Sequence, residues 1–297
     1  MFNQVTIVGT GLLGGSLARD LREQRLAKRL VGVCRSRETA QETLEAGVVD
    51  EVLPLTQAVA RADLVVLATP MQAMVPVITE MQSHLPTTTI VTDVGSVKTD
   101  LYNQLKQQVP GILSQFVLAH PIAGGENSGV SASKCGLFRN KHVIVTETSE
   151  VNPQMVSVVV DMWQHLGARV LSMSLQEHDA TFAKTSHLPH VIAFSLVNFL
   201  SHQPDRERLF DLAAAGFYDF TRIASSNAEM WRDICVTNRE QVLAALDGFH
   251  AQIDDIRELV ASADQAAILD YFGAAKAARD AGLIKRAEAI AQTQDAE

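Results

Sequence analysis

The sequence contains few cysteines for its length. Three occur among 297 residues, Cys34, Cys135 and Cys235, and no two of them are separated by two residues. Scattered cysteines of this kind predict neither a disulfide framework nor a zinc site. We find no other cluster of ligand residues, so we expect no bound metal.

Long apolar runs are also missing. The most apolar stretch, residues 191–200, is interrupted by Ser195 and Asn198, whereas a membrane-spanning helix needs about 20 apolar residues. The first four residues lead directly into a predicted strand, without the basic segment and apolar core of a secretory signal. We therefore expect a cytoplasmic protein with no membrane partner.

Basic residues are in deficit. The chain has 25 Lys and Arg residues against 34 Asp and Glu residues, which gives a formal net charge of −9. Nucleic-acid binding requires a basic surface that neutralises phosphates, so we expect no nucleic-acid partner. A small anionic substrate is compatible with this charge if cations are placed locally around it.

The first half of the chain alternates short apolar strands with amphipathic helices, a pattern typical of a parallel sheet with crossover helices. Most strands are Val, Ile and Leu runs without alternation, as expected for strands buried on both faces. The predicted strands cover residues 5–8, 30–34, 64–68, 89–92, 116–119 and 142–146, with a weaker one at 48–52 and a last one at 168–173. The predicted helices cover residues 12–22, 38–46, 55–60, 74–84, 98–107 and 154–166.

A glycine-rich turn follows the first predicted strand. Gly9, Gly11 and Gly14 form the pattern Gly-x-Gly-x-x-Gly between this strand and the first predicted helix. Here Gly9 permits a tight turn, Gly11 lets the backbone approach a pyrophosphate, and Gly14 lets the helix pack on the strand. The amides at the helix N-terminus would bind the anion. A glycine turn without a ligand is the alternative, and the position between strand and helix favours a dinucleotide site.

The end of the second predicted strand indicates which dinucleotide. An NAD-binding chain usually carries an acidic residue about 20 residues past the turn, but this sequence has Cys34 followed by Arg35, Ser36 and Arg37. Arginine meets a 2′-phosphate with paired hydrogen bonds, so we predict NADP, with NAD as the second choice. The alternative is two solvated arginines. The cofactor-binding candidates are Gly9, Gly11, Leu12, Leu13, Gly14, Arg35, Ser36, Arg37 and Thr69.

After residue 173 the pattern becomes helical to the end of the chain. Capping boxes at residues 174–177 and 226–229 mark two helix starts. We predict an α/β N-terminal Rossmann-type doubly wound sheet plus an all-α C-terminal domain. The dinucleotide-binding domain covers residues 1–173, and the helical domain for substrate binding and dimerisation covers residues 174–297.

An apolar seam runs along the predicted helix that begins near Glu240. Its side chains recur at alternating steps of four and three residues, which suits packing against another helix. That helix belongs either to the same domain or to a second copy of the chain in a homodimer. The seam consists of Val242, Leu246, Phe249, Ile253, Ile256 and Val260.

Three polar stretches stand out against this framework. Residues 92–98 and 119–126 each leave the carboxyl end of a predicted strand, where ligands bind in doubly wound sheets. The third is a helical pair, residues 185–190 and 216–222.

Four motifs lie in these stretches or begin in them, in this order behind the glycine turn: Asp-Val-Gly-Ser-Val-Lys, His-Pro-Ile-Ala-Gly, Ser-His-Leu-Pro-His and Asp-Phe-Thr-Arg-Ile-Ala. In these motifs the chain resembles the prephenate/arogenate dehydrogenase family, from residue 4 to about residue 260. The resemblance implies oxidative decarboxylation of prephenate or arogenate, with hydride transfer to NAD(P), in tyrosine biosynthesis.

The resemblance also assigns two catalytic residues. His120 matches the histidine that takes the proton of the substrate's ring hydroxyl, a role that suits a side chain with a pKa near working pH. Ser96 matches the serine that bonds both this histidine and the hydroxyl. Without the motif, His120 would be a strand-end histidine bonded to the backbone, and Ser96 an N-cap for a helix starting near Val97.

Three further residues match the family's substrate-binding positions, and we assign a fourth, Asp219, to the same site. Arg222 matches the arginine that binds a substrate carboxylate, although a surface salt bridge is the alternative. His187 matches a histidine of the substrate pocket, and Pro189 is expected to kink the helix beside it. Glu126 matches a glutamate at the pocket mouth, and we expect Asp219 to orient neighbouring cations.

Two other functions remain open from the residues alone. One is another dehydrogenase with a Rossmann domain and a helical domain, such as the β-hydroxyacid type. Those enzymes usually use a lysine of the helical domain, and Lys184, the only lysine of that half before Lys276, is not in such a motif. The other is a non-catalytic NADP-binding sensor, which would not need Ser96, His120 and Arg222 together.

Overall fold

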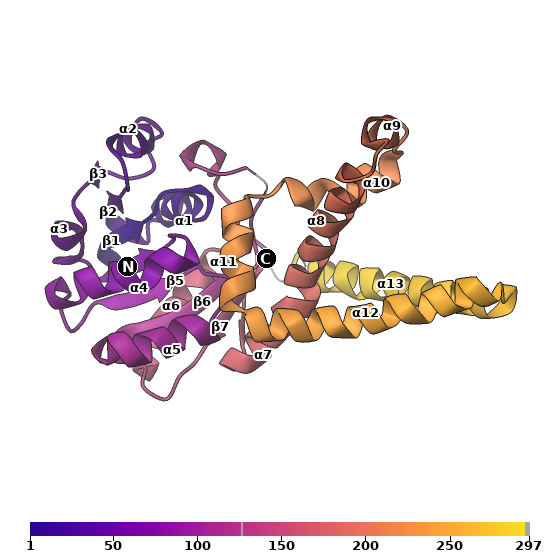
Figure 1. Cartoon of the computed structure of the whole chain (residues 1–297). Helices are drawn as coiled ribbons and strands as arrows, with labels where there is room; N and C mark the ends of the chain where they lie inside the picture. The colour runs from indigo at the N-terminus through magenta and orange to yellow at the C-terminus, as the bar shows by residue number, and fades with distance from the viewer. Residues whose placement is uncertain (126, 295–297) are drawn as a thin grey trace. The chain divides into compact units, whose positions relative to one another are not determined.

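A computed structural model describes residues 1–125 and 127–294, with side chains described as far as residue 288 (Figure 1). The chain divides into two compact units, Met1–Val242 and Leu243–Glu297. The first unit holds the sheet and all of the predicted catalytic and binding residues. Each unit is described by itself below.

The first unit is built on an eight-stranded sheet. Its strands lie in the order β3-β2-β1-β4-β5-β6-β7-β8. β2 and β3 lie on one side of β1, and the chain then crosses to the other side of β1 to form β4 and the later strands, as in a Rossmann-type sheet. The predicted fold class is therefore confirmed. The strands are β1 (Phe2–Val8), β2 (Ala27–Val33), β3 (Glu51–Val52), β4 (Leu64–Leu67), β5 (Ile90–Asp93), β6 (Phe116–Pro121), β7 (His142–Thr146) and β8 (Arg169–Ser172).

Helices cover both faces of this sheet. Along β4, Leu64 and Val66 pack into a core cluster with side chains of the first and sixth helices, whereas Val65 and Leu67 pack into a second cluster with the third, fourth and fifth. The prediction of strands buried on both faces is therefore confirmed. The helical segments up to β8 are α1 (Leu12–Glu23), α2 (Arg37–Glu45), α3 (Leu55–Val59), α4 (Met71–Met81), η1 (Gln82–His84), α5 (Thr99–Gln108), η2 (Pro110–Gln115), η3 (Val130–Ala132) and α6 (Pro153–His165).

The sheet departs from the predicted all-parallel arrangement at β7. This strand pairs with β6 in antiparallel fashion and with β8 in parallel fashion. A parallel neighbour would need a crossover helix, but the described part of the link between β6 and β7 contains only the three-residue η3. The link packs instead on α1, where Ser16 Oγ accepts from the Lys134 amide at 3.0 Å and Asp20 Oδ1 accepts from the Gly136 amide at 2.6 Å.

The reversal places the start of the helical region beside the site. Ser172 pairs with Val145, which pairs with Ala119 next to His120. The chain therefore leaves the sheet two strands away from His120. The segments that follow are α7 (Leu175–Phe182), the π-helix η4 (Ala183–His187), α8 (Leu188–Ser201), α9 (Arg206–Asp211), α10 (Ala215–Thr221), η5 (Arg222–Ser225), α11 (Ala228–Thr237), α12 (Arg239–Ser262) and α13 (Gln265–Gln294).

The two predicted capping boxes fare differently. Ser174 caps α7, since its hydroxyl accepts from the Glu177 amide at 3.2 Å. The second prediction is wrong by one residue, because Asn227 caps α11 by accepting from the Met230 amide at 2.9 Å. Asparagine and serine are comparably good N-caps, so adjacent candidates are not separated by residue type.

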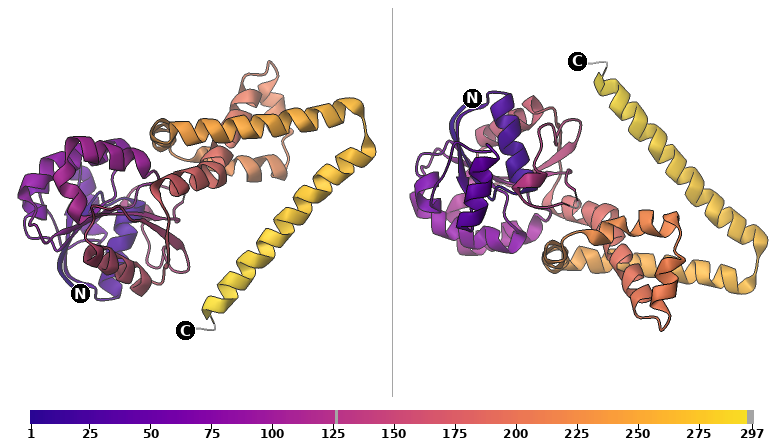
Figure 2. Two further views of the ribbon diagram at one scale, coloured as in Figure 1. Left: turned by 90° about the horizontal axis from the view of Figure 1, so that it is seen from below. Right: turned by 90° about the horizontal axis from the view of Figure 1, so that it is seen from above.

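The second unit consists of α13 and most of α12, two long helices joined by a short turn (Figure 2). Val242, the first residue of the predicted seam, is buried, but Ile253 and Val260 are 46% and 61% exposed. On α13, Leu269 and Phe272 are exposed as well. Packing within the chain therefore leaves much of the seam uncovered. None of the helices between residues 1 and 294 is long and apolar enough to cross a membrane.

Candidate active site

Four neighbouring strands bring the predicted site residues to one edge of the sheet. Gly9 follows β1, Thr69 lies two residues after β4, Ser96 follows β5, and His120 lies near the end of β6. These strands are adjacent and parallel. Since the carboxyl ends of parallel strands meet at one edge, the glycine turn and the two predicted catalytic residues share that edge.

The glycine turn has the geometry of a dinucleotide site. Gly9 has a φ of +94°, and a Cβ there would lie 2.7 Å from the Ala68 carbonyl oxygen, while a Cβ on Gly14 would overlap the Gly9 carbonyl oxygen. A Cβ on Gly11, in contrast, would meet no atom within 4 Å. Gly11 is the N-cap of α1 and provides no capping side chain. Open space therefore faces the first amides of α1, as an anionic ligand requires.

A buried hydroxyl beside the turn supports the same interpretation. Thr69 Oγ1 is buried and has no hydrogen-bond partner within the described residues. A buried polar atom without a partner is costly, and a cofactor bound along this edge could supply the partner. The residues present therefore fit a dinucleotide.

Gly11→Ala tests this interpretation without disturbing the fold. Because the added methyl group meets no protein atom, we expect the melting temperature of the free protein to stay close to that of the wild type. The methyl group would take up space against the pyrophosphate, so we expect the Kd for NADP to rise about tenfold, or about 1.4 kcal/mol. Calorimetric titration measures this value, and an unchanged Kd would remove the turn from the cofactor site.

The residues predicted to select NADP lie at the start of α2. Arg35, Ser36 and Arg37 are all exposed. The Ser36 hydroxyl caps α2 by accepting from the Thr39 amide at 3.1 Å. Ser36 thus has a structural role in addition to its predicted role, and both guanidinium groups remain accessible to a ligand.

A buried ion pair connects the loop that carries Ser96 with the strand that carries His120. Asp93 Oδ2 pairs with Lys98 Nζ, and both side chains are 0% exposed. Asp93 Oδ2 also accepts from the Gly95 amide at 2.8 Å, and Oδ1 accepts from the Ala119 amide at 3.0 Å. Burial lowers the pKa of Lys98, an effect that the charge of Asp93 opposes. The carboxylate therefore fixes the residue before Ser96 and the residue before His120.

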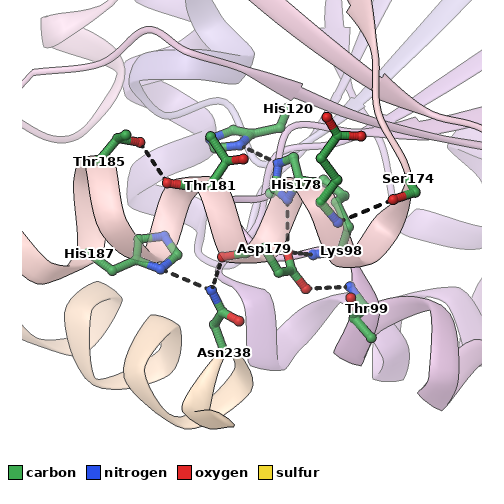
Figure 3. A network of polar contacts seen from close by, with 12 residues as sticks. Lys98, Thr99, His120, Ser174, His178, Asp179, Thr181, Thr185, His187 and Asn238 are labelled. Atoms are coloured by element: carbon green, nitrogen blue, oxygen red, sulfur yellow. Dashed lines mark hydrogen bonds and ion pairs between the residues drawn. The ribbon is translucent and has the colours of Figure 1, made fainter. Parts of the chain in front are cut away.

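His120 forms a hydrogen bond to a second histidine rather than to the backbone. Its Nδ1 lies 2.8 Å from Nε2 of His178 on α7, and His178 Nδ1 lies 2.8 Å from Asp179 Oδ1 (Figure 3). The Phe182 ring packs edge-on against His120 at a centroid distance of 5.0 Å. Burial, followed by the charges of His178, Lys98 and His187, holds the pKa of His120 well below its usual range. The alternative of a backbone-bonded histidine is therefore not observed.

The predicted N-cap role of Ser96 is not observed either. Helix α5 begins at Thr99, with Lys98 at the N-cap position and no capping side chain from that residue. Asp179 of α7 serves this helix start instead, since its carboxylate accepts from the Lys98 amide at 3.0 Å and from the Thr99 amide at 2.8 Å. Ser96 is partly buried and does not cap α5.

His187 ends the π-helix η4. Its Nδ1 accepts from Asn238 Nδ2 at 3.2 Å, and the same amide nitrogen donates to the Asp179 carbonyl oxygen at 3.0 Å. Burial lowers the pKa of His187 to about 4. The irregularity expected beside Pro189 therefore takes the form of a π-helical turn directly before α8.

The remaining predicted substrate residues lie farther along the chain. Arg222 opens η5 and Asp219 lies on α10, and both are exposed. Helix α10 and η5 pack against α8, which begins directly after His187. Glu126 lies outside the described residues.

Comparisons with known proteins decide the family. The family model described as "Prephenate dehydrogenase, nucleotide-binding domain" matches residues 17–172, and "Prephenate dehydrogenase, dimerization domain" matches residues 174–274. The chain belongs to the prephenate dehydrogenase family. The family predicted from the four motifs is therefore confirmed.

Members of this family are similar to the chain over nearly its whole length. "Prephenate dehydrogenase" of Bacillus subtilis is 35% identical over 98% of this chain and 79% of its own length. "Cyclohexadienyl dehydrogenase" of Zymomonas mobilis is 33% identical over 94% of this chain and 96% of its own. A crystal structure of prephenate dehydrogenase from Aquifex aeolicus, in complex with hydroxyphenyl propionate and NAD+, matches with a TM-score of 0.88 and 34% identity over 94% of this chain and 98% of that one. The prediction of an NAD(P)-dependent dehydrogenase is confirmed by this membership, and a β-hydroxyacid dehydrogenase or a sensor is not favoured.

Four residues of the site escaped the sequence analysis. Asp93 and Lys98 lie within a motif that we used only for its resemblance, and neither was assigned a role. No role was predicted for His178 and Asp179, although they lie in the helix whose cap, Ser174, was predicted correctly. Only the proximity of an acid to a histidine in the first turns of that helix could have marked them.

Proposed function

We propose that this chain oxidatively decarboxylates prephenate and/or arogenate with transfer of a hydride to NAD(P), in tyrosine biosynthesis. The observation that carries the proposal is the position of His120. It lies at the same edge of the sheet as the glycine turn, and its Nε2 has no hydrogen-bond partner within the described residues. The reaction requires a base with a free ring nitrogen that can accept the substrate proton.

His120 is proposed as the general base and Ser96 as its partner at the substrate hydroxyl. Nε2 of His120 takes the proton of the ring hydroxyl while the hydride leaves the carbon that bears this hydroxyl. Ser96 forms a hydrogen bond to the same hydroxyl. A bound nicotinamide dinucleotide would supply the hydride acceptor. The bond to the ring carboxyl group then breaks and carbon dioxide leaves. The electron pair of this bond moves through the ring to the new carbonyl oxygen, which takes back a proton and becomes the hydroxyl of an aromatic phenol. The protein mainly orients the reacting carbon and accepts the proton.

The proposed base predicts the pH dependence of kcat/KM. A histidine acts as a base only when neutral, so the rate rises with pH through the pKa of His120 and is level above it. Burial, followed by the electrostatic effects of His178, Lys98 and His187, lowers this pKa. We therefore expect the acid limb of kcat/KM to lie well below the usual range of a histidine. Initial rates across the pH range measure it, and an acid limb at or above the usual histidine pKa would contradict the assignment.

Arg222 is proposed to bind a carboxylate of the substrate, with His187 in the same pocket, Glu126 at its mouth and Asp219 orienting neighbouring cations. Because the Arg222 side chain is exposed, we expect Arg222→Ala to cost about 2 kcal/mol, the lower end for a charge pair that loses one partner. This corresponds to an increase in KM of about 30-fold with a smaller change in kcat. Arg208→Ala, on the exposed side of α9, is the control, and an unchanged KM for Arg222→Ala would exclude this role.

The cofactor and substrate preferences are tested together. We propose NADP over NAD because residues 34–37, directly after β2, provide two accessible guanidinium groups and no carboxylate. Initial rates with NADP and with NAD, each with prephenate and with arogenate, give the four values of kcat/KM. A marked preference for NAD would overturn the cofactor proposal. No reduction of either cofactor with either substrate would overturn the enzymatic proposal in favour of a sensor.

We also propose a homodimer formed through the helical region, with a dinucleotide-binding domain over residues 1–173 and a helical domain over residues 174–297. The exposed apolar side chains of α12 and α13 support this proposal. The description of the second family model as a dimerization domain supports it as well. Sedimentation equilibrium measures the mass of the particle. A concentration-independent monomer would contradict it.

A further inference from the structure

The base proposed above is the end of a chain of three side chains. His120 Nδ1 lies 2.8 Å from His178 Nε2, and His178 Nδ1 lies 2.8 Å from Asp179 Oδ1. Asp179 is held in turn by the Lys98 and Thr99 amides at the start of α5. Figure 3 shows these groups as one continuous line from α5 through α7 to His120.

The direction of each bond follows from the Asp179 carboxylate. Hydrogen bonds from His178 and from two backbone amides lower the pKa of Asp179 despite its burial, so the carboxylate can only accept. His178 Nδ1 must then carry the proton that is donated to it. Burial lowers the pKa of His178 and keeps this ring neutral, so its Nε2 is a hydrogen-bond acceptor. The one proton between the two rings therefore belongs to Nδ1 of His120.

We infer that His178 and Asp179 are positioning residues that hold His120 in the Nδ1–H tautomer, so that Nε2 presents a lone pair to the substrate hydroxyl. The inference rests on the proposed function of His120 as the base. It explains why a fully buried histidine, 0% exposed, lies against the reacting side chain. Capping of α5 by Asp179 alone would not require His178 to bond His120.

The tautomer matters because the two forms of a neutral imidazole are not equivalent. In the Nε2–H form, which free histidine prefers in water, the nitrogen that faces the substrate already carries a proton and cannot take another. In the Nδ1–H form it can. Once His120 has taken the proton, its Nδ1–H bond to His178 becomes charge-assisted and stronger. Asp93, the other carboxylate of this buried network, is already paired with Lys98, so we assign the balancing of the new charge to Asp179.

The tautomer is measured directly in the wild-type protein. Two-bond ¹⁵N–¹H correlation spectra of histidine-labelled enzyme distinguish a protonated ring nitrogen from an unprotonated one, and His120 is assigned by the signals that disappear in His120→Asn. We expect a protonated Nδ1 and an unprotonated Nε2 for His120, and the same pattern for His178. The opposite tautomer at His120 overturns the inference, whether or not the enzyme turns over prephenate. The expected tautomer in a protein inactive with prephenate and arogenate leaves the inference standing and overturns the proposed function.

Substitutions of His178 test the consequence for the rate. His178→Phe removes the acceptor, so we expect kcat to fall about 100-fold, within the range of a general base that has lost its activation, with KM changed less than about twofold because His178 does not touch the substrate. His178→Gln places a carbonyl oxygen where Nε2 was, and we expect it to recover about tenfold of that loss. Phe182→Leu alters packing against both rings but neither hydrogen bond, so it measures the effect of packing alone, and we expect it to lower kcat much less than His178→Phe does. If folded His178→Phe and His178→Gln lose kcat equally, His178 has only a packing role. The same conclusion follows if kcat falls as far in Phe182→Leu as in His178→Phe.

Discussion

His120→Asn is expected to lower kcat by about 100- to 10 000-fold, the usual contribution of a positioned general base. Asparagine is short and polar, so it can still bond His178 in the place of Nδ1. It has no group at the position of Nε2 and cannot take the hydroxyl proton there. Because hydride loss and proton loss occur at the same carbinol group, the rate of hydride transfer should fall with the base. The formation of reduced cofactor, followed by its absorbance, measures kcat.

Two measurements separate this loss from a disturbed site. The Kd for NADP should stay within about twofold of the wild-type value, since His120 is not among the cofactor-binding residues proposed from the turn. His165→Asn is the matched control, because His165 is an exposed histidine on α6 that bonds the Asp161 carbonyl oxygen. A kcat for His120→Asn near that of the control would remove His120 from the chemistry.

Lys98→Met is expected to lower the free energy of unfolding by about 3–5 kcal/mol, the cost of leaving one member of a buried ion pair without its partner. Both side chains are 0% exposed, so water cannot solvate the carboxylate that remains. Asp93 would still accept from the Gly95 and Ala119 amides, which partly compensates its charge. The loops on either side of the site should therefore loosen before the rest of the sheet. Urea unfolding, followed by circular dichroism, measures the change.

The same position offers a sharper comparison. In Asp93→Asn/Lys98→Met the charge is removed together with its partner, and the asparagine carbonyl can still accept from the Ala119 amide. We expect this double variant to be more stable than Lys98→Met. Lys106→Met breaks a solvated pair with Glu150, and it should leave unfolding almost unchanged. Equal effects of Lys98→Met and Lys106→Met would contradict the importance of burial at Lys98.

The parts of the fold that depend on local pattern were predictable. β4 is a short run of Val and Leu, and its alternate side chains do enter two separate core clusters. The glycine turn is defined by spacing within a few residues, and the clashes at Gly9 and Gly14 are the reason for that spacing. The direction of β7 was not predictable from its own residues, because it depends on how the preceding link packs on α1.

The hydrogen bonds that hold the proposed catalytic histidine were not predictable for the same reason. His120 and His178 are 58 positions apart, and Lys98 and Asp179 are 81 positions apart. Periodicity and motif spacing describe neighbours in sequence, whereas these contacts arise only when the sheet order and the start of α7 are known. A buried lysine such as Lys98 also contradicts the general preference of lysine for the surface. The carboxylate of Asp93, with a smaller contribution from Asp179, accounts for the burial of this charge.

The contacts of α7 bear on how this protein can be cut into independently folding pieces. A fragment that ends at residue 173, between the two family matches, would lack Asp179 and leave the Lys98 and Thr99 amides without their acceptors. It would also expose the face of His120 that His178 and Phe182 cover. A fragment extended through Phe182 keeps all of these partners. The shortest nucleotide-binding fragment that keeps these contacts therefore includes α7, a helix that lies within the second family match.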